Sequence, residues 1–310
     1  MVKITQVATI KDICNLNKSH GFTCEGHIMS HEIDYIVLIY CLIDDILKSN
    51  NHRDDPQCQV TDAEICTIAI VAMIDFGGNF EKSRNHLKKY NYIPGMIGKS
   101  RFTRRLYRAI PVLWICFNFL SRVWKAENSD SIYVIDSFPV PVCHNIRIKN
   151  CKIYQEKDFR GYTASKRQYF YGLKVHLMVT AHGDVVEMFM TPGSTADATA
   201  LKMYTFDLPL NSIIYADKAY NNYEIEDLMK ELESIYLIPV RKRNLKRQFD
   251  GAVRYLQNLH RKAVETTNSM ITKLFPKKIH AVTAQGFELK TFLFVLANSF
   301  ITYCEIFSAS

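Results

Sequence analysis

Three acidic residues stand in positions from which carboxylates can do chemistry. Asp136 ends the short apolar run 133–136, and Asp217 ends a second such run at 213–217. Buried strands deliver the residues at their carboxyl ends to a crevice, so we expect both carboxylates to reach one site. Glu265 lies in a helical segment that is otherwise largely apolar, and an acid there can point toward a sheet. For each acid alone, a turn, a helix cap or an exposed position is the commoner role.

Clustered carboxylates repel one another unless cations neutralise them. Hard divalent ions with oxygen ligands do this, and two such ions roughly 4 Å apart form the clamp used for in-line displacement at phosphorus. The three acids therefore predict two ions of Mg²⁺ or Mn²⁺. One ion activates the attacking water or 3′-hydroxyl, and the other stabilises the leaving oxygen.

The distribution of charge indicates the substrate. The chain has 310 residues, 48% of them hydrophobic, and a net charge of +8. Residues 82–108 hold nine Lys or Arg and no acid, residues 140–180 hold eight against two, and residues 241–262 hold eight against one. One basic run is commonly a solvated helix face, whereas three separated runs favour nucleic acid as a partner. The composition excludes disorder as the main state and low-complexity material, and no membrane crossing is predicted.

The hydrophobic pattern divides the chain into two regions. Up to about residue 128 it is helical, with a capping box at Thr61–Glu64 before the apolar run 65–74. From residue 129 we expect strands at 132–135, 168–179, 185–190, 212–216 and 235–240, and helices at 197–206, 223–233, 253–274 and 287–307. This order predicts an α/β (α+β) chain, with an all-helical region at 1–128 and a mixed-sheet domain at 129–310.

A short helix opening with basic residues is expected just after residue 100. Ser100 is its predicted cap, and Arg101, Arg104 and Arg105 lie in its first turns. This arrangement resembles a helix-turn-helix, whose second helix enters the major groove of DNA. Ordinary packed helices fit the same pattern equally well.

Further basic residues lie next to the predicted acids. Lys174 and His176 share one face of a predicted strand, from which they contact phosphate or form structural hydrogen bonds. Lys218 adjoins Asp217, and Arg261 lies one helical turn before Glu265. Either residue can bind DNA phosphate or restrain a carboxylate.

Two other features are open to more than one interpretation. Tyr162, Tyr169 and Tyr171 are interleaved with basic residues, so they either stack on unpaired bases or pack in the core. Asp197 either assists a metal site or caps the helix that follows it, and the cap is favoured.

Together these residues carry a resemblance to a known family. The segments are DSFPVP at 136–141, GYTASK at 161–166, YGLKVH at 171–176, DKAY at 217–220, RKAVE at 261–265 and IHAVT at 279–283, with SRFTRR at 100–105. Their order and spacing resemble the DDE transposases of bacterial insertion sequences, and the IS982 family in particular. The resemblance covers almost the whole chain.

The resemblance implies an RNase H-like catalytic core preceded by a DNA-binding region. It implies a DDE triad of Asp136, Asp217 and Glu265 that holds two metal ions. The implied reaction is cleavage at the ends of an insertion sequence, followed by joining of the 3′ ends to target DNA. The implied partners are the terminal inverted repeats, the target DNA and a second copy of the chain in a synaptic dimer.

Two other functions remain open at this point. A transposase-derived protein that binds DNA without cutting it would share these motifs, and so would a plain nuclease with the same core. Residues 1–18 contain no apolar export signal, which predicts a cytoplasmic protein. The resemblance implies that it is bacterial and associated with the nucleoid.

Overall fold

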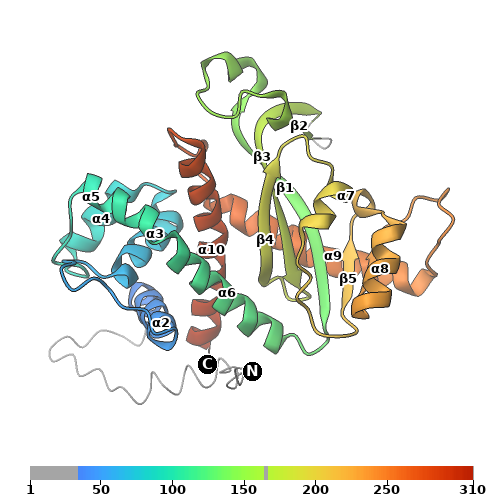
Figure 1. The fold of residues 1–310 in the computed structure, drawn as a ribbon, viewed down its shortest axis with the longest axis horizontal. Helices are drawn as coiled ribbons and strands as arrows, with labels where there is room; N and C mark the ends of the chain where they lie inside the picture. The colour runs from blue at the N-terminus through green and yellow to red at the C-terminus, as the bar shows by residue number, and fades with distance from the viewer. Residues whose placement is uncertain (1–33, 164–166, 310) are drawn as a thin grey trace. The chain divides into compact units, whose positions relative to one another are not determined.

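The computed structural model describes residues 34–163 and 167–309, which form two compact units (Figure 1). The first, here called the helical unit, contains the described residues up to Glu127, residues 274–276 and the chain from Phe292 onward. The second, the sheet unit, contains Asn128–Lys273 and Lys277–Thr291. The first 33 residues of the predicted N-terminal region lie outside the described residues.

The helical unit combines amphipathic helices with two helical segments that are buried on all sides. Its helices are α2 (Tyr35–Ser49), α3 (Asp62–Phe76), α4 (Phe80–Lys89), α5 (Lys99–Arg108), α6 (Ile110–Glu127) and the larger part of α10 (Ala284–Ala309). Every residue of α3 from Ile65 to Met73 is buried, as expected of a central helix. The predicted capping box is present, with the Thr61 hydroxyl and the Glu64 carboxylate each accepting from the other's backbone N–H.

The sheet unit contains a six-stranded mixed sheet. Its strands are β1 (Ile132–His144), β2 (Arg160–Thr163), β3 (Gln168–Thr180), β4 (Val185–Pro192), β5 (Ile213–Ala216) and β6 (Tyr236–Pro239). They run in the order β2-β3-β1-β5-β6, and β4 also pairs with β3. β1 is antiparallel to β3 and parallel to β5, and β5 is parallel to β6. Thus the middle of the sheet joins an antiparallel half to a parallel half.

Helices connect the strands and cover the sheet. They are α7 (Asp197–Ala200), α8 (Tyr223–Glu233) and α9 (Gly251–Leu274), and α9 passes behind β1 and β5 in Figure 1. The Gln257 side chain donates to the Ile238 carbonyl of β6 at 3.1 Å. One turn later the His260 ring stacks on Tyr215 of β5, and Thr267 donates to the Gly183 carbonyl between β3 and β4 at 2.7 Å. These contacts fix α9 across the sheet and so determine where its polar residues point.

Two predicted elements differ from the observed ones. β1 continues to His144, although Pro139 and Pro141 lie within it. This part of β1 pairs only with β3, because β5 ends at Ala216 opposite Ile135. The prolines lack N–H groups, but there is no strand on the other side of β1 here that would need them as hydrogen-bond donors. The helix predicted at 197–206 is only one turn of α7 and a 3-10 turn to Met203. It ends there because Tyr204 is buried and donates to the Leu177 carbonyl.

α10 is long and apolar enough to span a membrane by length and composition alone. An 18-residue window within Ala284–Phe307 has a mean hydropathy of 1.3, but 72% of that window is buried inside the protein. The bent pairs α3–α4 and α5–α6 pass the same test only when each is counted as one segment. Within the helical unit, Phe292 of α10 stacks on Trp114 with ring centroids 4.3 Å apart. The apolar residues of α10 are therefore used for packing.

Candidate active site

The sheet brings Asp136 and Asp217 to neighbouring strands. The parallel pairing of β1 with β5 ends at Ile135 opposite Ala216, so each aspartate is the next residue of its own strand path. The four residues before each aspartate are apolar or aromatic, and seven of these eight β-rich residues are isoleucine, valine or tyrosine. Both aspartates are partly exposed where β5 ends. Their carboxylates therefore share one edge of the parallel half of the sheet.

Arg261 of α9 links Asp217 to Glu265. One terminal nitrogen of its guanidinium lies 3.5 Å from Asp217 Oδ1, and the other lies 3.2 Å from Glu265 Oε1. The Glu265 side chain is 57% exposed, so it faces solvent on the side of the helix that carries Arg261. The Arg261 guanidinium thus lies close to both Asp217 and Glu265, which are two of the three predicted acids.

Asn268 completes this group from the next turn of α9. Its Nδ2 donates to Asp136 Oδ2 at 3.1 Å, whereas its Oδ1 is buried without a hydrogen-bond partner among the described residues. Arg261, Glu265 and Asn268 follow the i, i+4, i+7 spacing of one helical face. Asn268 was not among the predicted site residues, although this spacing could have identified it.

The environment of Asp136 disfavours its charged form. Burial raises the pKa of Asp136 to about 6, and the negative charges of Asp217 and Asp197 act in the same direction. The Ser137 backbone N–H and the Arg261 guanidinium oppose the shift without cancelling it. Perturbed carboxylates of this kind occur often at functional sites. The positive charge near Asp136 is therefore too small to offset the effect of burial on its pKa.

The donor set suits a hard divalent cation. Asp136, Asp217 and Glu265 offer carboxylate oxygens, and the unpartnered Oδ1 of Asn268 offers an amide oxygen, all of them types that Mg²⁺ and Mn²⁺ bind. An added positive charge would also relieve the raised pKa of Asp136. The three carboxylates do not all lie within 4.8 Å of one another among the described residues, and Arg261 stands between two of them.

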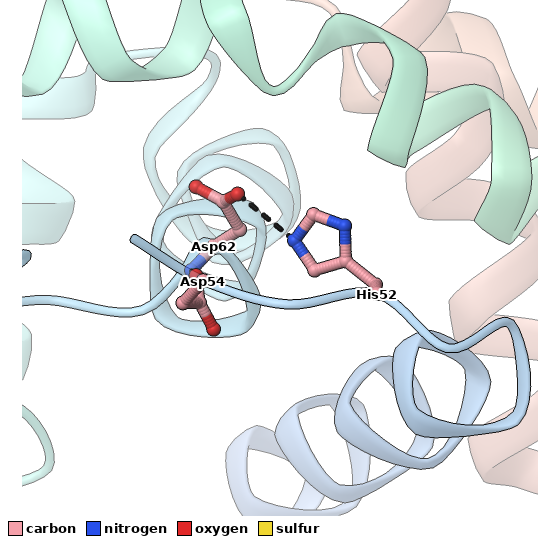
Figure 2. A group of neighbouring side chains, drawn as sticks. All are labelled: His52, Asp54 and Asp62. Atoms are coloured by element: carbon pink, nitrogen blue, oxygen red, sulfur yellow. Dashed lines mark hydrogen bonds and ion pairs between the residues drawn. The ribbon is translucent and has the colours of Figure 1, made fainter. Parts of the chain in front are cut away.

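A second acidic cluster lies in the helical unit. His52, Asp54 and Asp62 place one ligand atom each within 4.8 Å of the others, and Figure 2 shows the His52 ring facing the Asp62 carboxylate. Asp62 accepts from His52 Nε2 at 3.1 Å and from Arg105 at 2.6 Å. Asp54 accepts from the Asp62 backbone N–H at 2.7 Å. The ligand types are compatible with a metal, but Arg105 already supplies a positive charge to this cluster.

These contacts correct the prediction made for Arg105. Its guanidinium is mostly buried and held by Asp62, so it cannot reach a DNA phosphate without breaking that ion pair. We therefore assign Arg105 a structural role in the helical unit. Arg101 and Arg104 are exposed on α5, as a DNA contact requires.

The structure also corrects the interpretation of His176. This ring is 0% exposed, stacks on Phe189, and lies 2.9 Å from Thr191 Oγ1 through its Nε2. Burial lowers the pKa of His176 to about 4, so the ring is neutral at pH 7. A neutral, enclosed ring does not bind phosphate, and the structural hydrogen bond is the alternative that the structure favours.

The remaining basic residues lie at the edge of the acidic group. Lys174 donates to Asp197 Oδ1 at 3.2 Å and to the Thr195 carbonyl at 2.9 Å, whereas Lys218 is exposed beside Asp217. Asp197 also accepts from the Ser137 hydroxyl at 2.9 Å and makes no helix-capping bond. The favoured interpretation of Asp197 as a cap is therefore wrong. This residue instead ties Lys174 to the residue that follows Asp136.

Comparison with known proteins identifies the family. No curated protein and no solved structure matches the chain. A family model described as the transposase DDE domain matches residues 126–281, which is half of the chain and includes both aspartates, Glu265 and Asn268. The chain therefore belongs to the transposase DDE domain family.

Proposed function

We propose that this protein is an insertion-sequence transposase of the IS982 type. It cleaves phosphodiester bonds at the ends of its element and joins the freed 3′ ends to target DNA. Asp136, Asp217 and Glu265 form its DDE triad, and two divalent ions, Mg²⁺ or Mn²⁺, serve as cofactors. The parallel pairing of β1 with β5, which sets Asp136 beside Asp217, is the observation that carries this proposal.

Two further observations support the catalytic assignment. The order β4-β3-β1-β5-β6, antiparallel in its first half and parallel in its second, agrees with an RNase H-like core. α9 lies across that sheet and brings Glu265 to Asp217 through Arg261. Both arrangements bring together residues that are far apart in the chain. A chance grouping of acids would not require such long-range contacts.

The residues of the chain have distinct roles in the proposed reaction. When bound, the two ions supply the activation of the attacking oxygen and the stabilisation of the leaving oxygen. Asp136, Asp217 and Glu265 hold them, and Asn268 orients Asp136 through its amide N–H. Arg261 keeps Asp217 and Glu265 together before metal binds, and can then turn to a DNA phosphate. Lys218, which is exposed beside Asp217, contacts the same DNA backbone.

Binding of the element ends is assigned to the helical region. The exposed Arg101 and Arg104 of α5 lie on one basic helix surface and contact the terminal inverted repeats. In this proposal residues 1–128 are the DNA-binding region and residues 129–310 are the catalytic domain, although residues 274–276 and the chain from Phe292 onward pack in the helical unit. Two element ends must be held together, so the active form is a homodimer or a larger oligomer.

Cleavage of the element ends by an Asp136→Asn variant tests the proposal. The DNA is a duplex carrying the inverted repeat that flanks the reading frame, incubated with Mg²⁺. The variant should bind this duplex as the wild type does but cut it at least a thousandfold more slowly, roughly the 4 kcal/mol or more expected when a metal ligand is lost. Asp130→Asn, a change of an exposed aspartate in the same unit, is the matched control. Cutting by Asp136→Asn at the wild-type rate would overturn the assignment.

One observation favours a second function. Arg261 already neutralises Asp217 and Glu265, and the three acids do not all lie within 4.8 Å of one another. A transposase-derived protein that binds DNA without cutting could keep this arrangement. It predicts repeat binding with no metal-dependent nicking by the unmutated chain, so the same assay separates the two functions.

A further inference from the structure

Two tyrosines of the sheet unit face each other at the surface. Tyr162 of β2 and Tyr169 of β3 are a cross-strand pair, with ring centroids 4.9 Å apart. Their side chains are 52% and 49% exposed. Tyr154, nearby in the chain, is instead buried against Phe287. Core packing thus accounts for Tyr154 but not for the exposed pair.

A cation accompanies the tyrosine pair. The Arg160 guanidinium lies over the Tyr169 ring, 4.2 Å from its centroid, and is itself exposed. The surrounding segment, residues 146–163 and 167–171, is here called the arm. It contains the exposed cations Arg147, Lys149, Lys152, Lys157, Arg160 and Arg167 against two acids, Glu156 and Asp158. None of these six cations forms an ion pair with another described residue.

This combination matches the chemistry of single-stranded nucleic acid. Exposed aromatic rings stack on unpaired bases, and unpaired cations beside them neutralise the phosphates. A protein partner would need acidic groups opposite these cations, and a membrane surface would need an amphipathic helix, which the strands β2 and β3 do not provide. The charge of the arm and its aromatic pair together favour an unpaired DNA strand as the occupant.

The sheet register sets the distance between the arm and the acids. Asp136 pairs with Leu177 of β3, and Tyr169 precedes Leu177 by eight residues on the same strand. At about 3.3 Å per residue this corresponds to roughly 26 Å along β3. In Figure 1 the arm, drawn in green, extends beyond the end of β4, away from β5. Bases held by the arm are therefore distant from the bond that the acids would cut.

We propose that Tyr162, Tyr169 and Arg160 form a stacking site for unpaired DNA bases, about 26 Å along β3 from Asp136. This stacking site rests on the proposed function only in taking DNA as the ligand. It assigns to the arm the binding of unpaired bases, which the three acids do not contact. Each tyrosine ring stacks on a base, while Arg160 holds the Tyr169 ring in place and contacts the adjoining phosphate.

Fluorescence anisotropy with a labelled oligothymidylate tests this site. The full chain is compared with the double variant Tyr162→Ala/Tyr169→Ala, with Tyr162→Phe/Tyr169→Phe, and with Tyr255→Ala, which removes a 69% exposed tyrosine from α9. The double alanine variant should bind at least about fivefold more weakly, whereas the phenylalanine and Tyr255 variants should bind as the wild type does. Arg160→Ala should lower the slope of log affinity against log salt by about 0.7.

A second set of oligonucleotides isolates stacking from charge. An abasic strand of the same length keeps the phosphates but offers no rings, so the wild type and the double alanine variant should bind it equally. Circular dichroism confirms that each variant is folded. Equal binding of oligothymidylate by the wild type and the double alanine variant would overturn the proposal, as would an equal loss on the abasic strand or on a fully paired duplex.

The test of the stacking site can fail or succeed independently of the test of the proposed transposase activity. Tyrosine-dependent binding by a chain that never cuts DNA would leave the stacking site standing and remove the transposase activity. Metal-dependent cutting by a chain whose tyrosine variants bind single strands normally would do the reverse.

Discussion

Replacing Asp136 by asparagine should stabilise the fold while removing a proposed metal ligand. The pKa of Asp136 is raised from 3.8 to about 6 by burial. A shift of about two units corresponds to about 3 kcal/mol of unfolding free energy at pH 7, taken as an upper bound because the side chain keeps some contact with solvent. The amide introduced by Asp136→Asn carries no charge to desolvate, and it can donate to the unpartnered Oδ1 of Asn268.

The pH dependence gives this prediction its sign. Below about pH 4 the carboxyl group is protonated in both the folded and the unfolded chain, so wild type and variant should be equally stable. Between about pH 4 and pH 6 the unfolded carboxyl ionises first, and the wild type loses stability relative to the variant. Above about pH 6 the difference should be constant.

Urea unfolding followed by far-UV circular dichroism, without divalent metal, measures the difference at pH 4, 5, 6, 7 and 8. Adding Mg²⁺ at about 100 times its dissociation constant should stabilise the wild type by about 2.7 kcal/mol, with a much smaller effect on Asp136→Asn. A variant no more stable than the wild type at pH 7, or a difference that does not shrink toward pH 4, would refute the reasoning. Asp130→Asn should change the free energy of unfolding by less than about 0.5 kcal/mol at every pH.

Three further predictions concern the same chain. At subsaturating Mg²⁺, the rate of DNA cleavage should fall as the pH is lowered through about 6, because Asp136 must be ionised to bind metal. Arg261→Gln should move the midpoint of this pH dependence upward, because Arg261 lowers the pKa of Asp136. The pH–rate profiles of both proteins check this. Asn268→Leu should weaken Mn²⁺ binding about tenfold in calorimetry, since it removes the amide that orients Asp136, and unchanged affinity would exclude that role. Thr61→Ala should destabilise the helical unit by about 1 kcal/mol in urea unfolding, whereas Thr103→Ala on exposed α5 should not.

The sequence predicted the parts of the fold that depend on local pattern. The capping box at Thr61 and the apolar strands before Asp136 and Asp217 are signals carried by a few adjacent residues. The length of β1 was missed because prolines normally exclude a strand, and only the sheet topology reveals that its second half has one neighbour. The early end of the helix at 197–206 depends on the burial of Tyr204, which is a tertiary contact.

The candidate site divides along the same line. The neighbouring positions of Asp136 and Asp217 could be predicted from the apolar runs before them. The prediction that Asp136 ends its strand was wrong, because β1 continues to His144 and only Asp217 follows the end of a strand. The burial of His176 and the pairing of Arg105 with Asp62 could not be predicted, since both depend on residues packed against them from elsewhere in the chain. Asn268 shares a helical face with Arg261 and Glu265, so its spacing could have identified it, but its hydrogen bond to Asp136 depends on how α9 lies across the sheet.

Anomalous diffraction from crystals of the full chain grown with Mn²⁺ tests the central claim most directly. We predict manganese bound between Asp136 and Asp217, with Glu265 completing the coordination after the Arg261 guanidinium has moved aside. Manganese found only at His52, Asp54 and Asp62, or absent from both clusters at millimolar concentration, would contradict the account.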